Sequence, residues 1–431
     1  MTTPIQIDST RLLNELQILA TFTNVEPAPD GTAVTRIVFS PDDLRARTWL
    51  KELATIEDFE IREDAVGNTF IRWLGTEPDL PAVATGSHID AIPHAGMYDG
   101  TVGVLGGLEA IRALKYAGIR PRRSIELIVF TSEEPTRFGI GCLGSRLLAG
   151  TLDPDRADDL HEVHPIRAIK EPADAIPRSL AELRATAGFT GPLSSVRLQP
   201  KHYHAWLELH IEQGPLLERA GIPIGIVTSI AAPASYRFTI TGLGGHAGAL
   251  LMPDRKDALC AAAEVILSIE KNTLASGAVD TVATVGTVTV HPGAVNSVPS
   301  RVVLQLDIRD TDPARREAVM RNIRRDYIDM AQRREVTIIE ELINADVPAQ
   351  CSGHIVLLLE QLCEEQGLAY KEMVSRAYHD SLFMAPIAPI AMIFIPCRNG
   401  VSHRPDEYAA PTDILQGTRL LAQALAKLAS E

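Results

Sequence analysis

The sequence predicts an α/β fold in which a mostly parallel, mixed sheet forms one domain and an α+β domain is inserted into it. Short apolar runs alternate with helical patterns in the order that βαβ units require. This pattern changes between residues 231 and 344 and is then resumed, so the sheet domain is split along the chain. We therefore expect one domain of residues 1–230 plus 345–431 and an inserted domain of residues 231–344.

The elements of the sheet domain follow one another in a regular order. Residues 81–88 form an apolar run that predicts a buried strand, and after a glycine-rich loop residues 101–117 repeat apolar positions at helical spacing. Gly118 predicts the end of that helix. Further strands of the same sheet are expected at residues 124–134, 204–215 and 389–397. Residues 151–200, rich in Pro, Asp, Arg and Ser, are expected to form a partly helical excursion.

The inserted domain is predicted from alternating strand patterns around one helix. Strands are expected at residues 237–242, 280–293 and 301–310, and a helix at residues 257–272. In the last of these strands, Leu304, Leu306 and Ile308 point to one face, and the polar residues between them point to the other. The polar face of this sheet is therefore a candidate wall for a cleft.

Composition and charge exclude several classes of function. The 431 residues, 45% of them hydrophobic and 22% charged, can bury a core large enough for more than one domain. An excess of 55 acidic over 41 basic residues gives a net charge of −14, which disfavours nucleic acid and anionic membranes as partners. The five cysteines are scattered, and neither a signal peptide nor a membrane-span pattern is present. We therefore expect a cytoplasmic protein without disulfides.

Residues of the types that bind metals follow the first predicted strand. His88 ends this strand, and Asp99 lies in the glycine-rich loop before the helix. Imidazole and carboxylate groups are ligands for zinc and manganese. Asp90 could accept the other imidazole N–H of His88 and so fix its tautomer. Taken alone, such residues are more often turn and cap residues.

Three further strand ends add ligand-type side chains. Glu133 and Glu134 are neighbours at the end of the second strand. The repulsion between their two carboxylates is unfavourable unless a cation neutralises it. His210 ends the third strand, and His403 follows the fourth. Each of these residues alone also fits a solvated turn or a structural histidine. Because ligands bind at the carboxyl ends of strands in open α/β sheets, the set together indicates a metal site with one spare glutamate as a base.

Several motifs are similar to those of one family of metal-dependent hydrolases. GSHID, YDG, TSEE, ELHIEQGP, GGHAGA, DIRD and the late NGVSH, spread over nearly the whole chain, resemble the co-catalytic metallopeptidase-like amidohydrolases. This group includes N-carbamoyl-L-amino-acid hydrolases, allantoate amidohydrolases and ureidoglycolate amidohydrolases. The segments SRAYHDSLFMA and MIFIPCRNGVSH look most like those of the ureidoglycolate enzymes. The resemblance implies a metallo-exopeptidase-like catalytic domain with an inserted lid and dimerisation domain.

The resemblance also implies that Asp99 bridges two divalent metal ions. His88 and His210 would complete one metal site. Glu134 and His403 would complete the other. Mn²⁺ is expected first from the likeness to the ureidoglycolate enzymes and Zn²⁺ second, and these ligand types also accept Co²⁺ or Ni²⁺.

Catalytic roles outside the metal ligands come from the same resemblance. Glu133 would be the general base that takes a proton from the attacking water. His246 and Asn296 lie in the inserted domain and would donate hydrogen bonds to the oxyanion from the lid of the partner subunit. The protein is therefore expected to be a homodimer in which the subunits share active-site residues.

Four residues are expected to contact the ureido substrate. Arg309 would hold a substrate carboxylate through two parallel hydrogen bonds, and a salt bridge with a neighbouring aspartate is the alternative. Tyr378 stands where carbamoylases and allantoate enzymes have a small residue, so it would narrow the pocket and favour a short substrate. Gln213 and His379 are further pocket candidates, although His379 fits a core histidine held by Asp380 equally well.

The expected reaction is hydrolysis of the terminal carbamoyl amide of (S)-ureidoglycolate, which gives ammonia, carbon dioxide and finally glyoxylate late in purine and allantoin degradation. An N-carbamoyl-L-amino-acid hydrolase or an allantoate amidohydrolase would share every metal ligand and differ in pocket shape. A metallo-exopeptidase or aminoacylase is disfavoured because peptidase relatives usually carry an acid where this chain has His210. A homologue that binds but has lost catalysis is disfavoured, because all the expected metal-ligating residues and the expected base Glu133 are present.

Overall fold

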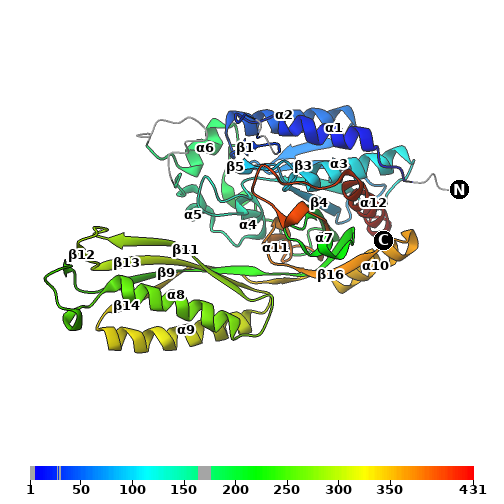
Figure 1. Ribbon diagram of the computed structural model, residues 1–431. Coiled ribbons are helices and arrows are strands. Elements are labelled where there is room, and N and C mark those ends of the chain that lie inside the picture. The colour runs from blue at the N-terminus through cyan, green and yellow to red at the C-terminus, as the bar shows by residue number, and fades with distance from the viewer. Residues whose placement is uncertain (1–4, 27, 29–30, 164–175) are drawn as a thin grey trace. The chain divides into compact units, whose positions relative to one another are not determined.

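The protein consists of two compact units, and Figure 1 labels many of their elements. The computed structural model describes residues 5–26, 28, 31–163 and 176–431. Unit 1 comprises Met1–Thr228, Gln350–Met373 and His379–Glu431, and unit 2 comprises Ser229–Ala349 and Val374–Tyr378. Unit 2 therefore includes residues 229–230, 345–349 and 374–378, which were expected to belong to the other domain.

The large sheet is mixed, as the sequence predicts. Its strands follow the order β15-β8-β17-β7-β4-β6-β3-β2, with β16 beside β8. The four strands β17, β7, β4 and β6 run parallel at its centre, and β8, β3 and β2 flank them in antiparallel pairs. The strand bounds are β2 (Glu60–Glu63), β3 (Thr69–Trp73), β4 (Val83–His88), β6 (Ile125–Phe130), β7 (Ala205–Ile211), β8 (Ile224–Ile230), β15 (Ala349–Gln350), β16 (Tyr370–Ser375) and β17 (Ile390–Ile395).

The parallel centre of the sheet is the part that the apolar runs predicted. Every residue of β4, β6, β7 and β17 is buried, which is the environment that continuous apolar strands require. Because these four strands are parallel, their carboxyl ends lie at one edge of the sheet, and the residues that follow them are brought together there.

Helices cover the sheet of unit 1, and α3 lies directly against its central strands. An added Cβ on Gly103 of α3 would lie 2.5 Å from the carbonyl oxygen of Leu209 in β7, so glycine permits this close approach. The bounds are α1 (Ser9–Ala20), α2 (Pro41–Ile56), α3 (Thr101–Tyr116), α4 (Leu143–Ala149), α5 (Pro154–Asp158), α6 (Leu180–Thr186), η2 (Leu193–Ser195), α7 (Leu216–Ala220), α10 (Gly353–Gln366), α11 (Asp380–Met384), η4 (Arg398–Gly400) and α12 (Pro411–Leu428), with the paired strands β1 (Val34–Arg36) and β5 (Ala91–Ala95). In the described parts of the chain, no helix combines the length and apolar character that crossing a membrane requires.

Unit 2 is an antiparallel sheet packed against two helices. Its strands follow the order β11-β13-β9-β14. Leu304, Leu306 and Ile308 are buried in a core that includes residues of both helices, which confirms the predicted alternation in this strand. The bounds are β9 (Ala232–Thr241), β10 (Gly245–His246), η3 (Met252–Asp254), α8 (Ala258–Leu274), β11 (Val282–His291), β12 (Ser297–Val298), β13 (Arg301–Asp310), α9 (Pro313–Arg334) and β14 (Thr337–Ala345).

Helix α9 and strand β14 are elements that the sequence analysis missed. Helix α9 spans 22 residues and carries a polar, arginine-rich surface, so only a few widely spaced side chains such as Met320 and Ile323 are buried. Strand β14 lies at the edge of its sheet and is mostly exposed or half-buried. Neither segment therefore has the dense apolar pattern that marks the other elements.

Candidate metal centre

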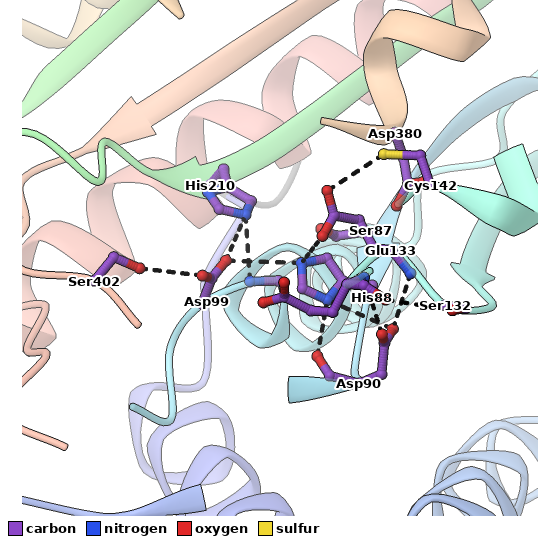
Figure 2. A network of polar contacts seen from close by, with 12 residues as sticks. Ser87, His88, Asp90, Asp99, Ser132, Glu133, Cys142, His210, Asp380 and Ser402 are labelled. Carbon is purple, nitrogen blue, oxygen red and sulfur yellow. Dashed lines mark hydrogen bonds and ion pairs between the residues drawn. The ribbon is translucent and has the colours of Figure 1, made fainter. Parts of the chain in front are cut away.

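Five imidazole and carboxylate side chains meet at the carboxyl edge of the parallel strands. His88 is the last residue of β4, and His210 lies near the end of β7. Glu134 follows β6, and His403 lies in the loop after β17. Asp99 stands just before α3 and points toward His88 and His210 in Figure 2. The topology of the sheet thus collects ligand-type residues from five separate segments.

Asp99 lies at the centre of this group. Its Oδ1 is 3.2 Å from Nε2 of His210 and 3.7 Å from Nε2 of His88. Its Oδ2 is 3.1 Å from Nε2 of His403, whose Nε2 is also 3.4 Å from Oε1 of Glu134. The structure therefore forms two ligand groups that share Asp99, one with His88 and His210 and one with Glu134 and His403.

The ionisable groups of the cluster shift one another's pKa values. In the protein without bound cations, burial raises the pKa of Glu134 to about 8, and repulsion from Asp99 raises it further. Burial opposes ionisation of Asp99, but hydrogen bonds from His210 and His403 hold its pKa well below the ordinary range. The hydrogen bond to Asp99 raises the pKa of His403 to about 9. Protons thus balance the negative charge, a role that divalent cations can take over.

The donor set fits divalent cations. Ligand atoms within each of the two groups all lie within 4.8 Å of one another, and His88, Asp99, His210 and Glu134 are buried. Nδ1 of His88 is 3.0 Å from the carbonyl oxygen of Asp90, and Nδ1 of His210 is 2.9 Å from that of Ile211. These carbonyl contacts leave Nε2 of both rings directed at Asp99, as metal-binding histidines require.

The side chain of Asp90 has a different partner from the one that the sequence suggested. Its carboxylate lies 3.7 Å from Nδ1 of His88, and the closer acceptor for that nitrogen is the backbone carbonyl of the same residue. The carboxylate instead accepts hydrogen bonds from the backbone N–H groups of Glu133 at 3.2 Å and Glu134 at 3.0 Å. Asp90 therefore links the loop after β4 to the loop after β6.

Glu133 borders the cluster without entering either ligand group. Its Oε2 is 3.7 Å from Nε2 of His88, and its Oε1 accepts a hydrogen bond from Sγ of Cys142 at 3.3 Å, as Figure 2 shows. Burial raises the pKa of Glu133 well above the ordinary range, and repulsion from Glu134 adds to this effect. A buried carboxylate with a raised pKa beside the candidate metal ligands makes Glu133 a candidate general base.

Gln213 contacts the centre of the cluster directly. Its Nε2 donates to Oδ2 of Asp99 at 2.8 Å and to Oγ of Ser402 at 3.2 Å. Gln213 was predicted to contact the substrate, and in the structure its amide nitrogen contacts Asp99 and Ser402.

Comparison with known proteins identifies the family of the chain. Residues 84–427 match peptidase family M20/M25/M40. The chain belongs to this family. It is 49% identical over 429 residues to the ureidoglycolate hydrolase of Oryza sativa subsp. japonica, an alignment that covers 99% of this chain and 86% of that protein. It is 37% identical over 402 residues to the N-carbamoyl-L-amino acid amidohydrolase of Geobacillus stearothermophilus, covering 93% and 94% of the two chains.

A solved structure supports the same assignment. The crystal structure of AtUAH in complex with (S)-hydroxyglycine has 46% sequence identity and a TM-score of 0.85, and the comparison covers 100% of both chains. The resemblance inferred from the motifs is thus confirmed, and so is the mixed α/β fold of the M20/M25/M40 family.

A second set of buried acids lies behind the cluster of this M20/M25/M40 protein. Glu208 accepts hydrogen bonds from Oγ of Ser87 at 2.8 Å and Oγ of Ser381 at 2.6 Å. Asp380 accepts one from Ser145 at 2.5 Å, and burial raises its pKa to about 8. Neither acid was predicted to belong to the site. Glu208 stands two residues before His210 in an apolar strand, a signal that could have revealed it. The contact of Asp380 with Ser145, in contrast, depends on the packing of α4 against α11.

The remaining predicted substrate residues are divided between the units. His379, in unit 1, is buried, and its ring centroid is 4.5 Å from that of His210. With Glu208 and His210 it forms a third group of possible ligands. In unit 2, the guanidinium of Arg309 lies over the Tyr378 ring at 5.4 Å. Its Nε donates to Asp307 at 2.8 Å, so the salt bridge considered as the alternative is present.

The two residues proposed for oxyanion stabilisation are neighbours in unit 2. His246 in β10 pairs with Ser297 in β12, and the N–H of Ala247 donates to the carbonyl oxygen of Asn296 at 2.9 Å. Both His246 and Asn296 are exposed in the single chain. Their side chains are therefore accessible to a molecule that approaches unit 2 from solvent.

Proposed function

We propose that this M20/M25/M40 protein is a metal-dependent amidohydrolase that cleaves the carbamoyl C–N bond of (S)-ureidoglycolate. The products would be ammonia and a carbamate that loses carbon dioxide, after which hydroxyglycine would break down to glyoxylate and a second ammonia. The observation that carries this proposal is the 49% identity, over nearly the whole chain, to a ureidoglycolate hydrolase. The ligand cluster around Asp99 supplies the chemistry that such a reaction needs.

The proposed cofactor is a pair of divalent cations that share Asp99. His88 and His210 would hold one cation, and Glu134 and His403 the other. We propose Mn²⁺ as the native metal, and Zn²⁺, Co²⁺ or Ni²⁺ also suit this mixture of imidazole and carboxylate ligands. Bound cations would polarise the ureido carbonyl and lower the pKa of water.

Glu133 is the proposed general base. Its Oε2 faces the cluster beside His88 and would accept a proton from the attacking water. The same oxygen would then return the proton to the departing nitrogen, which leaves as ammonia. Sγ of Cys142 holds the other oxygen, Oε1, and so directs the carboxylate toward the reacting group.

Residues of unit 2 would complete the site. Arg309 would pair with the substrate carboxylate in place of Asp307, and Tyr378, over which its guanidinium lies, would limit the length of the substrate. His246 and Asn296 would donate to the oxyanion in the active site of the partner subunit of a homodimer. Their exposure in the single chain supports a role outside their own unit. The cytoplasm is the proposed location, since all five cysteines are free.

The substrate is tested by ammonia release from protein stripped with a chelator and reloaded with Mn²⁺. Ureidoglycolate, allantoate and N-carbamoyl-L-amino acids are compared as kcat/KM values under identical conditions. We expect the highest value for ureidoglycolate. The alternative is an N-carbamoyl-L-amino-acid hydrolase, because the 37% identity to the Geobacillus stearothermophilus enzyme spans 93% of this chain. A preference for allantoate or for a carbamoyl amino acid would refute the ureidoglycolate assignment while leaving the metal site intact.

A further inference from the structure

One buried carboxylate connects two of the loops that carry the cluster. Glu407 lies in the same loop as His403, and only 4% of its surface is exposed. Its side chain reaches the turn before α3, which carries Asp99. No sequence pattern predicts a role for Glu407, because its backbone partners Tyr98 and Asp99 are 309 and 308 residues away along the chain.

Both oxygens of Glu407 are occupied by this turn and by Ser402. Oε1 accepts hydrogen bonds from the N–H groups of Tyr98 at 2.9 Å and Asp99 at 3.0 Å. Oε2 accepts from Oγ of Ser402 at 2.8 Å. The same Oγ lies 3.1 Å from Oδ2 of Asp99. Glu407 thus contacts the backbone of Asp99 directly and its carboxylate through one hydroxyl group.

Glu407 packs so closely against Gly96 that no side chain fits at position 96. An added Cβ on Gly96 would lie 2.3 Å from Cβ of Glu407 and 2.5 Å from its Oε1. The loop of Asp99 can therefore approach the loop of His403 only because a glycine stands at this position. The approach and the hydrogen bonds together hold the two loops at a fixed separation.

We propose that Glu407, through Ser402, is a positioning residue that holds Asp99 and His403 in register for binding cations. A carboxylate that bridges two cations must direct its two oxygens toward different ions, so its backbone and side chain both need support. Glu407 fixes the backbone, and the hydroxyl of Ser402, whose single proton is shared between Oε2 of Glu407 and Oδ2 of Asp99, restrains the rotation of the Asp99 carboxylate. The inference rests on the metal site of the proposed function.

The test is the affinity for Mn²⁺, measured by titration calorimetry on the full chain. Glu407→Ala removes all three hydrogen bonds and is expected to weaken binding about 10- to 100-fold. Glu407→Gln keeps an acceptor for the two N–H groups and offers an N–H to Ser402, so it should bind nearly as tightly as the wild type. Ser402→Ala removes the contacts of the hydroxyl with Glu407, Asp99 and Gln213 but keeps the two hydrogen bonds between Glu407 and the backbone of the Asp99 turn. It should therefore give a smaller loss than Glu407→Ala.

Glu109→Ala is the matched control. Glu109 is a fully buried acid of α3 that accepts hydrogen bonds from the backbone N–H of Asp8 and from the guanidinium of Arg11, and among the described residues it has no hydrogen bond or ion pair with the cluster. Its loss should lower the melting temperature without weakening Mn²⁺ binding. Equal losses of affinity in Glu109→Ala and Glu407→Ala would overturn the proposal, because they would reflect general destabilisation.

Further outcomes are equally decisive. Wild-type affinity in Glu407→Ala would overturn the positioning role. If that variant does not fold, Ser402→Ala decides, and an unchanged affinity in it would overturn the proposal. A wild-type protein that takes up no Mn²⁺ would refute the metal site of the proposed function itself, which is a separate result.

Discussion

Asp99 and Glu133 have opposite electrostatic surroundings although both are acids of one cluster. Three imidazoles surround Asp99, and their hydrogen bonds keep it ionised despite its burial. Glu133 faces one imidazole, that of His88 at 3.7 Å, and accepts a thiol hydrogen bond at its Oε1, and burial raises its pKa. Two acids with pKa values shifted in opposite directions suit two roles, one as a ligand and one as a base.

Replacing Glu133 should separate catalysis from metal binding. Glu133→Gln keeps the shape of the side chain but removes the base, so kcat should fall by at least about 100-fold while the metal content stays unchanged. Asp99→Ala, in contrast, should lose both cations because the two ligand groups share this residue. Elemental analysis and ammonia release measure the two properties. Substantial turnover by metal-replete Glu133→Gln would show that another group is the base.

Residue types at strand ends, and Asp99 before a predicted helix, indicated the candidate metal ligands, and the resemblance to the family distinguished Glu134 as a ligand from Glu133 as a base. His88, Glu134 and His210 follow apolar runs, and their convergence follows from the parallel order of those strands. The contact of Gln213 with Asp99 and the role of Glu407 could not be predicted in this way. Both depend on loops that meet only after folding and that have no periodic pattern.

At the scale of elements, the site is assembled from the ends of β4, β6, β7 and β17 and the start of α3. Apolar strands predicted the parallel centre, since full burial on both faces requires continuous hydrophobic runs. Strand β2 and helix α9 were missed because they are partly exposed and carry charged residues. Strand β8 was also missed, although it is almost fully buried and contains no charged residue. The predictable elements are therefore those that carry the ligands.

Metal removal should change how stability depends on pH. Without cations, the folded-state pKa is about 8 for Glu134 and about 9 for His403, both above the ordinary values of 4.5 and 6.5. The folded state then binds more protons than the unfolded chain, so stability falls as pH rises through these values. Cations require deprotonated ligands, so they bind more tightly as pH rises.

The melting temperature measures this effect. The difference between Mn²⁺-loaded and chelated protein should widen between about pH 6 and about pH 9, as proton competition with the metal disappears. His88→Ala serves as the control, since it should show a smaller metal-dependent difference throughout. A difference that stays constant or narrows with rising pH would contradict the assigned ligands.

At the scale of the whole molecule, the proposed reaction needs residues from both units. Unit 1 holds the candidate metal ligands and Glu133, whereas His246, Asn296 and Arg309 lie in unit 2. The sequence showed where the chain changes character near residues 231 and 344. It did not show that residues 374–378, including Tyr378, belong with the inserted unit, because so short a segment has no pattern of its own.

A mixed dimer tests whether the subunits share active sites. Glu133→Gln and His246→Ala chains should each be inactive as homodimers. Co-expressed with different tags and purified as a heterodimer, they should regain activity, because one site then combines an intact Glu133 with the partner's intact His246. A heterodimer as inactive as both parents would show that His246 acts within its own chain.

Anomalous diffraction from crystals grown with Mn²⁺ tests the di-metal centre most directly. Two peaks are expected on either side of Asp99, one beside His88 and His210 and the other beside Glu134 and His403. A single peak, or a peak among Glu208, His210 and His379, would contradict the bridging role of Asp99.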